Sequence, residues 1–311
     1  MGRLGLQSTG GNPTSSPFRN GPFTWDQQVT FTSGLSGVNT PGDVWYVDST
    51  NGNNSNDGKS WATAFASIQT AIDAAGTTGD VIFVGPGDYS IATALTIGTN
   101  NLTIIGPNRS ANDYRALVYT SAAANLVEVD ANQVSIIGLG FSAAGGNGHG
   151  IAVSGTTASY KLYVAHCRFD GWSNTGYGVK TDDTQDSPDI IVEDCLFRSW
   201  ATGGIYANAT RGVYRRNMIW ADAASVGINF VQTGGNRPDS MAYDNMIIGS
   251  NSTDTGIKIA ATEPTDGTLL VANNVVTNCS TNITQDKSDA GVVNNGTYGN
   301  SAAPVIVDPN A

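Results

Sequence analysis

The sequence predicts an all-β chain wound as a parallel β-helix, because two short phrases recur along its second half with nearly one period. The first phrase is Gly followed by Ile or Val. It begins at residues 150, 178, 204, 227 and 256, with gaps of 28, 26, 23 and 29 residues. The second is an apolar residue, two variable residues, Asn or Cys, one variable residue and an apolar residue, as in Val164–Phe169 and Val271–Val276. Two independent phrases that share a period of about 20 to 30 residues are typical of a solenoid.

Each period contains two or three short strand-like runs, separated by Gly, Asn, Asp and Ser. Strand alternation points Cys167 and Phe169 into the core and Arg168 outward. Residues one period apart should then stack on adjacent coils, about 4.8 Å apart. The recurrent Gly is expected at a turn with positive φ or in a closely packed position. The register predicts two aromatic ladders and one amide ladder: Phe169 over Phe197, Trp172 over Trp200, and Asn217, Asn245 and Asn274.

The segment upstream of the repeats predicts a cap for the open end of the solenoid. Ser60 is a candidate N-cap, and Gly76 is a helix stop. Between them runs one apolar helical stripe made of Trp61, Phe65, Ile68, Ile72 and Ala75. We therefore expect a helix over 61–75, which shields the solenoid core from water.

These phrases resemble the right-handed parallel β-helix superfamily, which has the pectate-lyase-like fold. The repeats cover roughly residues 125–285, the segment Asp57–Tyr89 resembles the capping segment of such proteins, and Ala303–Pro309 resembles their extended closing segment. The resemblance implies a single-stranded, right-handed parallel β-helix with an N-terminal capping helix and an extended N-terminal arm. The expected divisions are an arm at 1–43, a cap at 44–91, the β-helix at 92–300 and a closing segment at 301–311. The fold leaves function open, since it hosts lyases, hydrolases, adhesins and viral spikes alike.

Composition excludes several classes of partner. A net charge of −11 argues against nucleic acid and anionic membranes. The sequence contains no run of 18 apolar residues, so it predicts no membrane-spanning helix. The three cysteines, Cys167, Cys195 and Cys279, give no disulfide framework and are expected to be small buried residues. With two histidines in the chain, no Cys/His spacing suggests a metal site, and we expect no cofactor.

Residues 1–43 carry no coil repeat and are rich in Gly, Pro, Ser, Thr and Asn. Such a segment cannot bury enough apolar surface to order itself, so we expect another surface to hold it. Its anchors would be its apolar side chains: Phe18, Phe23, Trp25, Val29 and Phe31. The alternative is an arm folded back along its own β-helix. An arm joined to a β-helix body resembles bacteriophage virion proteins, in which an N-terminal segment attaches to the particle and the β-helix projects, often as a trimer. The resemblance implies virion proteins, of the capsid or the tail, and further copies of the chain as partners.

Two groups of charged residues are candidates for chemistry. Asp182 and Asp183 begin an acidic cluster that continues to Asp189, beside Lys180. It could bind calcium or supply an acid/base pair, but a solvated loop is the preferred interpretation because Thr, Gln, Ser and Pro are interspersed. The repeat register also stacks one column of mostly charged residues, with Glu193 and Arg215 paired beside it: His166, Asp194, Arg216, Asp244 and Asn273. Alternating charges of this kind favour structural pairing over a His166–Asp194 dyad.

The sequence therefore favours a non-enzymatic virion structural protein, either a head decoration or fibre or a tail-spike component, with no catalytic residue. The alternative is a carbohydrate-active β-helix enzyme, such as a tailspike depolymerase, a polysaccharide lyase or a glycoside hydrolase. It would act on a host surface glycan through Asp182, Asp183 and Asp194. A third class is a bacterial adhesin or carbohydrate-binding module. The first ten residues lack the apolar stretch of a secretory signal, which makes that third class less favoured.

Overall fold

The computed structural model places two units along the chain, Met1–Thr40 and Pro41–Ala311. The described residues all belong to the second unit. They are 42–76, 79–108, 115–122, 124–144, 146, 148–153, 161–181, 189–209, 211–222, 225–231, 240–250, 253–259, 269–285, 291–293 and 295–298. The five predicted arm anchors and the closing segment 301–311 lie outside these residues.

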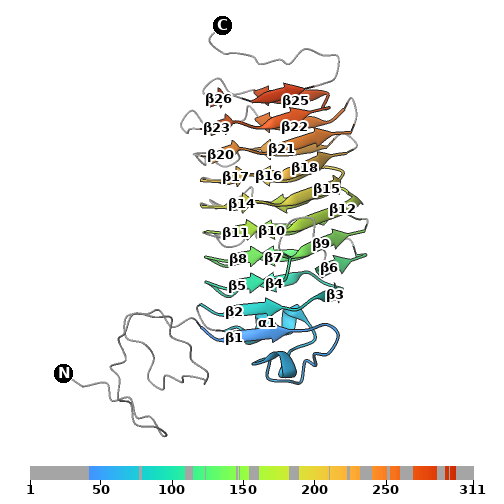
Figure 1. Cartoon of the computed structure of the whole chain (residues 1–311), viewed down its shortest axis with the longest axis vertical. Coiled ribbons are helices and arrows are strands. Elements are labelled where there is room, and N and C mark those ends of the chain that lie inside the picture. Colours follow the sequence, from blue (N-terminus) through green and yellow to red (C-terminus); the bar gives the residue numbers. More distant parts are fainter. Residues whose placement is uncertain are drawn as a thin grey trace, which may run out of the picture. The chain divides into compact units, whose positions relative to one another are not determined.

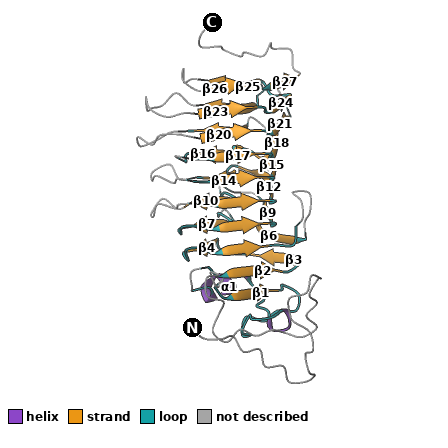
Figure 2. Ribbon diagram, turned by 60° about the vertical axis from the view of Figure 1, so that its left-hand side comes forward, coloured by secondary structure: helices purple, strands orange, loops and turns teal. Residues whose placement is uncertain are grey.

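The second unit is a right-handed parallel β-helix, which confirms the predicted fold class. Each complete coil gives one strand to each of three parallel sheets, and successive coils stack along the solenoid axis (Figures 1 and 2). Neighbouring strands in a sheet therefore come from coils that are one period apart in the sequence. In the described part of the chain, no helix has the length and apolar character needed to cross a membrane.

The three sheets are named here in the order in which a coil visits them. Sheet 1 contains ten described strands: β1 (Val44–Val47), β2 (Val81–Val84), β5 (Thr103–Ile105), β8 (Ser135–Ile137), β11 (Tyr163–Ala165), β14 (Ile191–Glu193), β17 (Val213–Arg215), β20 (Ser240–Tyr243), β23 (Leu269–Ala272) and β26 (Gly291–Val293). Sheet 2 contains nine: β3 (Gly87–Ser90), β6 (Ala116–Thr120), β9 (Gly140–Ala143), β12 (Arg168–Asn174), β15 (Leu196–Trp200), β18 (Met218–Ala221), β21 (Met246–Gly249), β24 (Val275–Thr277) and β27 (Gly296–Tyr298). Sheet 3 contains eight: β4 (Leu95–Ile97), β7 (Val127–Val129), β10 (Ile151–Val153), β13 (Tyr177–Lys180), β16 (Gly203–Ala207), β19 (Val226–Phe230), β22 (Thr255–Ile259) and β25 (Thr281–Gln285).

The core consists of side chains that repeat at the same height on every coil. The predicted stack of Phe169 over Phe197 is present, with ring centroids 4.7 Å apart and planes 4° apart, and Phe141 extends it by one coil. Stacked pairs of this kind are worth about 0.5–1.5 kcal/mol beyond the area they bury. Cys167 and Cys195 are buried in the same column, as predicted.

The corner between sheets 1 and 2 is a tight turn made by one residue with left-handed backbone. His166, Asp194, Arg216, Asp244 and Asn273 all have φ between 54° and 56°, so the predicted column of charged residues is the turn itself. The buried amide ladder follows directly after it. Asn217 Nδ2 donates to Asn245 Oδ1 over 3.1 Å, and the next rung repeats the bond. The ladder satisfies backbone groups that a turn leaves without strand partners.

The recurrent Gly lies within a strand of sheet 3, or directly before it in the case of Gly150, with no positive φ, and is required by close packing. A Cβ atom at Gly227 would lie 2.5 Å from the carbonyl oxygen of Gly256 and 2.7 Å from Cγ2 of Ile247. Of the two expectations for this Gly, close packing holds and a turn does not.

The cap differs from the single helix predicted over 61–75. The structure has a short 3₁₀ helix, η1, at Trp61–Thr63, and a separate α-helix, α1, at Ile68–Ala74. Ser60 caps η1, and Ser67 caps α1. The chain is extended between them because Phe65 forms a β-bridge with Val47. Phe65 thus reaches the core from a strand-like segment, and Trp61 is left 51% exposed.

One further expectation is wrong at sheet 2. Trp172 does not stack on Trp200: it is 66% exposed and has φ 45°, whereas Trp200 is buried. The cause is a register shift in β12, which places Asn174 opposite Trp200. Arg168 points out of the core as expected, yet only 9% of its surface is exposed. It is therefore a buried charge rather than an ordinary surface residue.

Candidate functional site

The enzymatic alternative would use three carboxylates, and of these Asp194 belongs to the described residues. Asp182 and Asp183 lie outside the described residues. Asp189, at the end of the same acidic cluster, accepts two hydrogen bonds from Arg211, at 2.7 and 3.3 Å. The guanidinium holds the pKa of Asp189 below its usual value. This end of the cluster is thus a structural ion pair.

Asp194 lies at the corner between sheets 1 and 2 and is also ion-paired. Its two oxygens accept bonds from Nε and an Nη atom of Arg216, at 2.9 and 2.7 Å. Such a two-point contact fixes the planes of both groups. The bonds from Arg216 lower the pKa of Asp194. Both His166 and Asp194 are described, and no hydrogen bond joins them, so the considered dyad is not formed.

Glu193 is the centre of a larger polar cluster on sheet 1. The carboxylate accepts bonds from the Tyr163 hydroxyl at 2.6 Å, from Arg215, and from Arg216 at 2.8 Å. Burial acts to raise the pKa of Glu193, but the bonds from Tyr163 and Arg215 outweigh it, and the pKa is lowered. Arg215 also donates to the Tyr243 hydroxyl at 2.8 Å. The predicted pairing of Glu193 with Arg215 is confirmed, and the cluster links four successive coils.

A second buried charge pair lies on sheet 2. Arg168 Nε donates to Asp170 at 2.8 Å, and the two side chains are 11% and 8% exposed. Arg198 lies opposite Asp170 in register, while its guanidinium sits 4.8 Å from the centre of the Trp220 ring. Arg168 therefore makes the hydrogen bond to Asp170, while burial raises the pKa of Asp170 and the charge of Arg198 acts to lower it.

The outer face of sheet 3 is a polar strip that sequence reasoning did not single out. Its central column comprises Thr96, Glu128, Ala152, Lys180, Tyr206, Asn229, Lys258 and Thr284. Lys180 lies 5.6 Å from the centre of the Tyr206 ring. Asn229 donates to the Tyr177 hydroxyl at 3.1 Å, while its buried Oδ1 has no partner. The strip thus combines two cations, aromatic rings and an unused acceptor.

His149 borders this strip as a neutral acceptor. The Tyr177 backbone N–H donates to His149 Nδ1 at 2.9 Å. Burial, aided by the nearby Lys180, lowers the pKa of His149 to about 4. The imidazole is therefore neutral at physiological pH and serves to hold the loop before β13.

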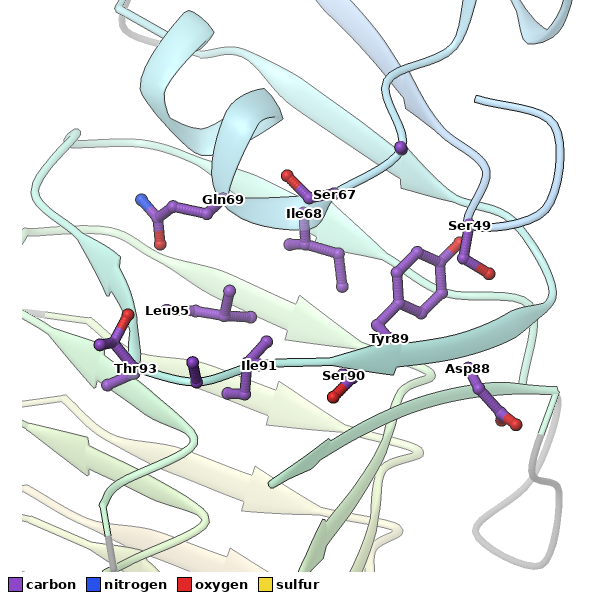
Figure 3. A pocket seen from close by; sticks show the side chains of 13 residues that line it. Ser49, Ser67, Ile68, Gln69, Asp88, Tyr89, Ser90, Ile91, Thr93 and Leu95 are labelled. Atoms are coloured by element: carbon purple, nitrogen blue, oxygen red, sulfur yellow. The ribbon is translucent and has the colours of Figure 1, made fainter. Parts of the chain in front are cut away.

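A pocket of about 310 Å³ opens between α1 and the segment 88–95 in the cap (Figure 3). Its floor is apolar, with Ile68, Leu95 and Tyr89 turned toward the space. The Tyr89 hydroxyl donates to the Gly85 carbonyl at 2.8 Å, and burial raises its pKa to about 12. The polar groups lie on the rim, where Ser67 and Gln69 are engaged in bonds within the cap. Among the described residues, no three His, Cys, Asp or Glu side chains are grouped to hold a metal ion.

The strip on sheet 3 is hard to recognise in the sequence, because its residues are far apart in the chain and share no type. The repeat register does align them, so one signal was present. Reading the residue after each Gly-Ile or Gly-Val phrase gives Ala152, Lys180, Tyr206, Asn229 and Lys258.

No family model and no curated protein matches this sequence. Several solved structures share the fold at low identity. YbhC of Escherichia coli aligns with a TM-score of 0.56 and 9% identity, over 89% of this chain and 90% of that one. An alginate lyase of family PL6 aligns with a TM-score of 0.50 and 13% identity, over 88% of this chain and 41% of that one. A tailspike protein of an Escherichia coli bacteriophage aligns with a TM-score of 0.46 and 12% identity, over 74% and 36%. At these identities the likeness is one of fold.

Proposed function

We propose that the chain is a structural protein of a bacteriophage particle, attached through its N-terminal arm and displaying the β-helix. The observation that carries the structural role is the ion pairing of Asp194. A carboxylate fixed by Arg216 with a lowered pKa is charged at neutral pH and cannot donate a proton. Its lone pairs already accept bonds, so it is also a poor base. Of the three candidate catalytic residues, Asp194 is thus part of the corner between sheets 1 and 2.

The phage setting rests on the arrangement of the chain. An arm rich in Gly, Pro and Ser, with a few aromatic residues, precedes a body that has its own cap and core. Such an arm gains order only against another surface. Virion proteins and further copies of this chain are the partners we propose, and the virion is the proposed location.

The test is removal of the arm. Gly42 and Asp43 bond to Gly79 and Asp80, so truncation at residue 41 leaves the body intact. We expect the truncated protein to keep its melting temperature but to be lost from assembled particles. Trp25→Ala in the full chain should weaken incorporation at least several-fold, since buried aromatic residues dominate most interfaces. Incorporation of the truncated protein at the wild-type level would contradict attachment through the arm.

A second candidate function is glycan binding or cleavage on the outer face of sheet 3. It is favoured by the two lysines and by Tyr206. Aromatic rings with nearby hydrogen-bonding groups suit sugar rings, and the lysines suit acidic sugars. The test is incubation with capsular and pectic polysaccharides, with and without calcium. Chain shortening that is lost in Asp182→Asn/Asp183→Asn would support an enzyme. Binding that is lost in Lys180→Ala, without shortening, would support a glycan-binding face.

A further inference from the structure

The outer face of sheet 1 is unusually apolar for a surface exposed to water. In its three-residue strands the middle side chain enters the core, and the two flanking side chains point outward. We call the outward residues from β1 to β23 the outer strip. One of its columns reads Tyr46, Phe83, Ile105 and Ile137 on successive coils. All four are half-buried rather than covered.

The outer strip continues along the solenoid beyond these coils. Ile191 and Met241 belong to its other column, and Met241 is 42% exposed. The charged residues within the strip, Glu193 and Arg215, are paired with each other. The strip is therefore without net charge, in a chain whose net charge is −11.

The size of the strip is that of a protein interface. Nine strands, about 4.8 Å apart, give a length of roughly 40 Å, and the exposed area is on the order of several hundred Å². Contiguous apolar patches of this size usually mark interaction sites. A stable interface buries about 800 Å² per partner, so the strip supplies a large part of one.

We propose that the outer strip is the surface on which a second copy of this chain docks, strip against strip. A glycan would find no side-chain hydrogen-bonding group at Phe83, Ile105 and Ile137, and the polar groups around Glu193 are bonded to one another. A polyanion would find no net positive charge. A second copy offers an apolar strip of the same length. It also brings two strongly acidic molecules together at a face where neither carries net charge. This inference does not depend on the proposed role in a virion.

The chain contains a matched pair of probes for this contact. Met241 lies in the outer strip and Met246 on the outer face of sheet 2, in the same coil, and they are 42% and 41% exposed. Peroxide converts exposed methionine to its sulfoxide. We expect light scattering to show more than one copy per particle. In the associated protein, Met241 should oxidise at least tenfold more slowly than Met246. On dilution to the single chain, the two rates should converge. A single copy at all concentrations, or equal rates in the associated protein, would overturn the proposal.

Substitution supplies the second measurement. Ile105→Lys places a charge in the outer strip, and Thr96→Lys places one on the polar face of the preceding coil. We expect Ile105→Lys to reduce association at least tenfold and Thr96→Lys to leave it unchanged. Circular dichroism would establish that both variants are folded. A folded Ile105→Lys protein that associates like the wild type would exclude this face, and if that variant does not fold, the methionine rates alone decide.

Discussion

At the scale of single residues, this structure is dominated by charges that are held in pairs. Asp194, Glu193 and Asp170 each bind an arginine, and each carboxylate has little freedom left for other chemistry. The repeat register predicted which residues lie opposite one another on adjacent coils. It could not predict which of two nearby arginines each carboxylate would take, because that choice depends on side-chain reach and burial.

The pair formed by Arg168 and Asp170 gives the first prediction. Removing Arg168 leaves a buried carboxylate without its cation, so Arg168→Ala should lower the free energy of unfolding by about 1–3 kcal/mol. Arg198→Ala is the matched control, because Arg198 is exposed and lies on the next coil opposite Asp170. It should cost less than about 0.5 kcal/mol. Urea melts of the two variants would test the difference, and equal losses would show that Arg168 is not the buried partner.

His149 gives the second prediction, which concerns pH. Its pKa is about 4 in the folded protein and near 6.5 when unfolded. Between these values the unfolded chain binds the proton and the folded chain does not, so acidification through this window destabilises the fold. We expect roughly 1–2 kcal/mol of loss from this half-buried ring, after allowing for solvent screening. His149→Asn keeps an acceptor for the Tyr177 N–H and should remove this part of the loss. His166→Asn is the control, and a pH profile of His149→Asn like that of the wild type would contradict the assignment.

At the scale of elements, the sequence predicted strand order, register and core column well, because each coil repeats the same pattern of side chains. It failed where a local feature replaced the pattern. The register shift in β12 displaced Trp172, and the β-bridge at Phe65 divided the predicted helix in two. Neither event has a periodic signal, since each depends on contacts with a distant strand.

The recurrent Gly tests this view of the repeats. Gly227→Ala should be destabilising by about 1–3 kcal/mol, because its Cβ would overlap the carbonyl oxygen of Gly256. Gly98→Ala is the control, since a Cβ there meets no atom within 4 Å. That change should be neutral or stabilise by up to about 1 kcal/mol. Thermal melts would separate the two variants. A neutral Gly227→Ala would show that the strands of sheet 3 can move apart freely.

At the scale of the whole second unit, stability is shared between neighbouring coils, because the strands of each coil pair only with those of the coils above and below it. The first coil has no coil on its outer side. There α1 contacts β1, β2 and β4, and it buries Ile68, Ala71 and Ile72. Sequence reasoning found this cap from its apolar stripe. It missed the polar strip of sheet 3, because the residues that the register aligns there share no type.

The cap provides the last prediction. Ile72→Asn places an amide among apolar side chains at the end of the solenoid, where it finds no strand partner, whereas Asp73→Asn changes an exposed position on the same helix. Because coupling runs from coil to coil, Ile72→Asn should open the first coils and leave the middle of the solenoid closed. Hydrogen exchange should therefore quicken at least tenfold in peptides from 44–97 and change little in peptides from 190–222. The Asp73→Asn protein should exchange like the wild type in both. If Ile72→Asn quickened exchange equally along the solenoid, the coils would unfold as a single cooperative block and α1 would stabilise all of them.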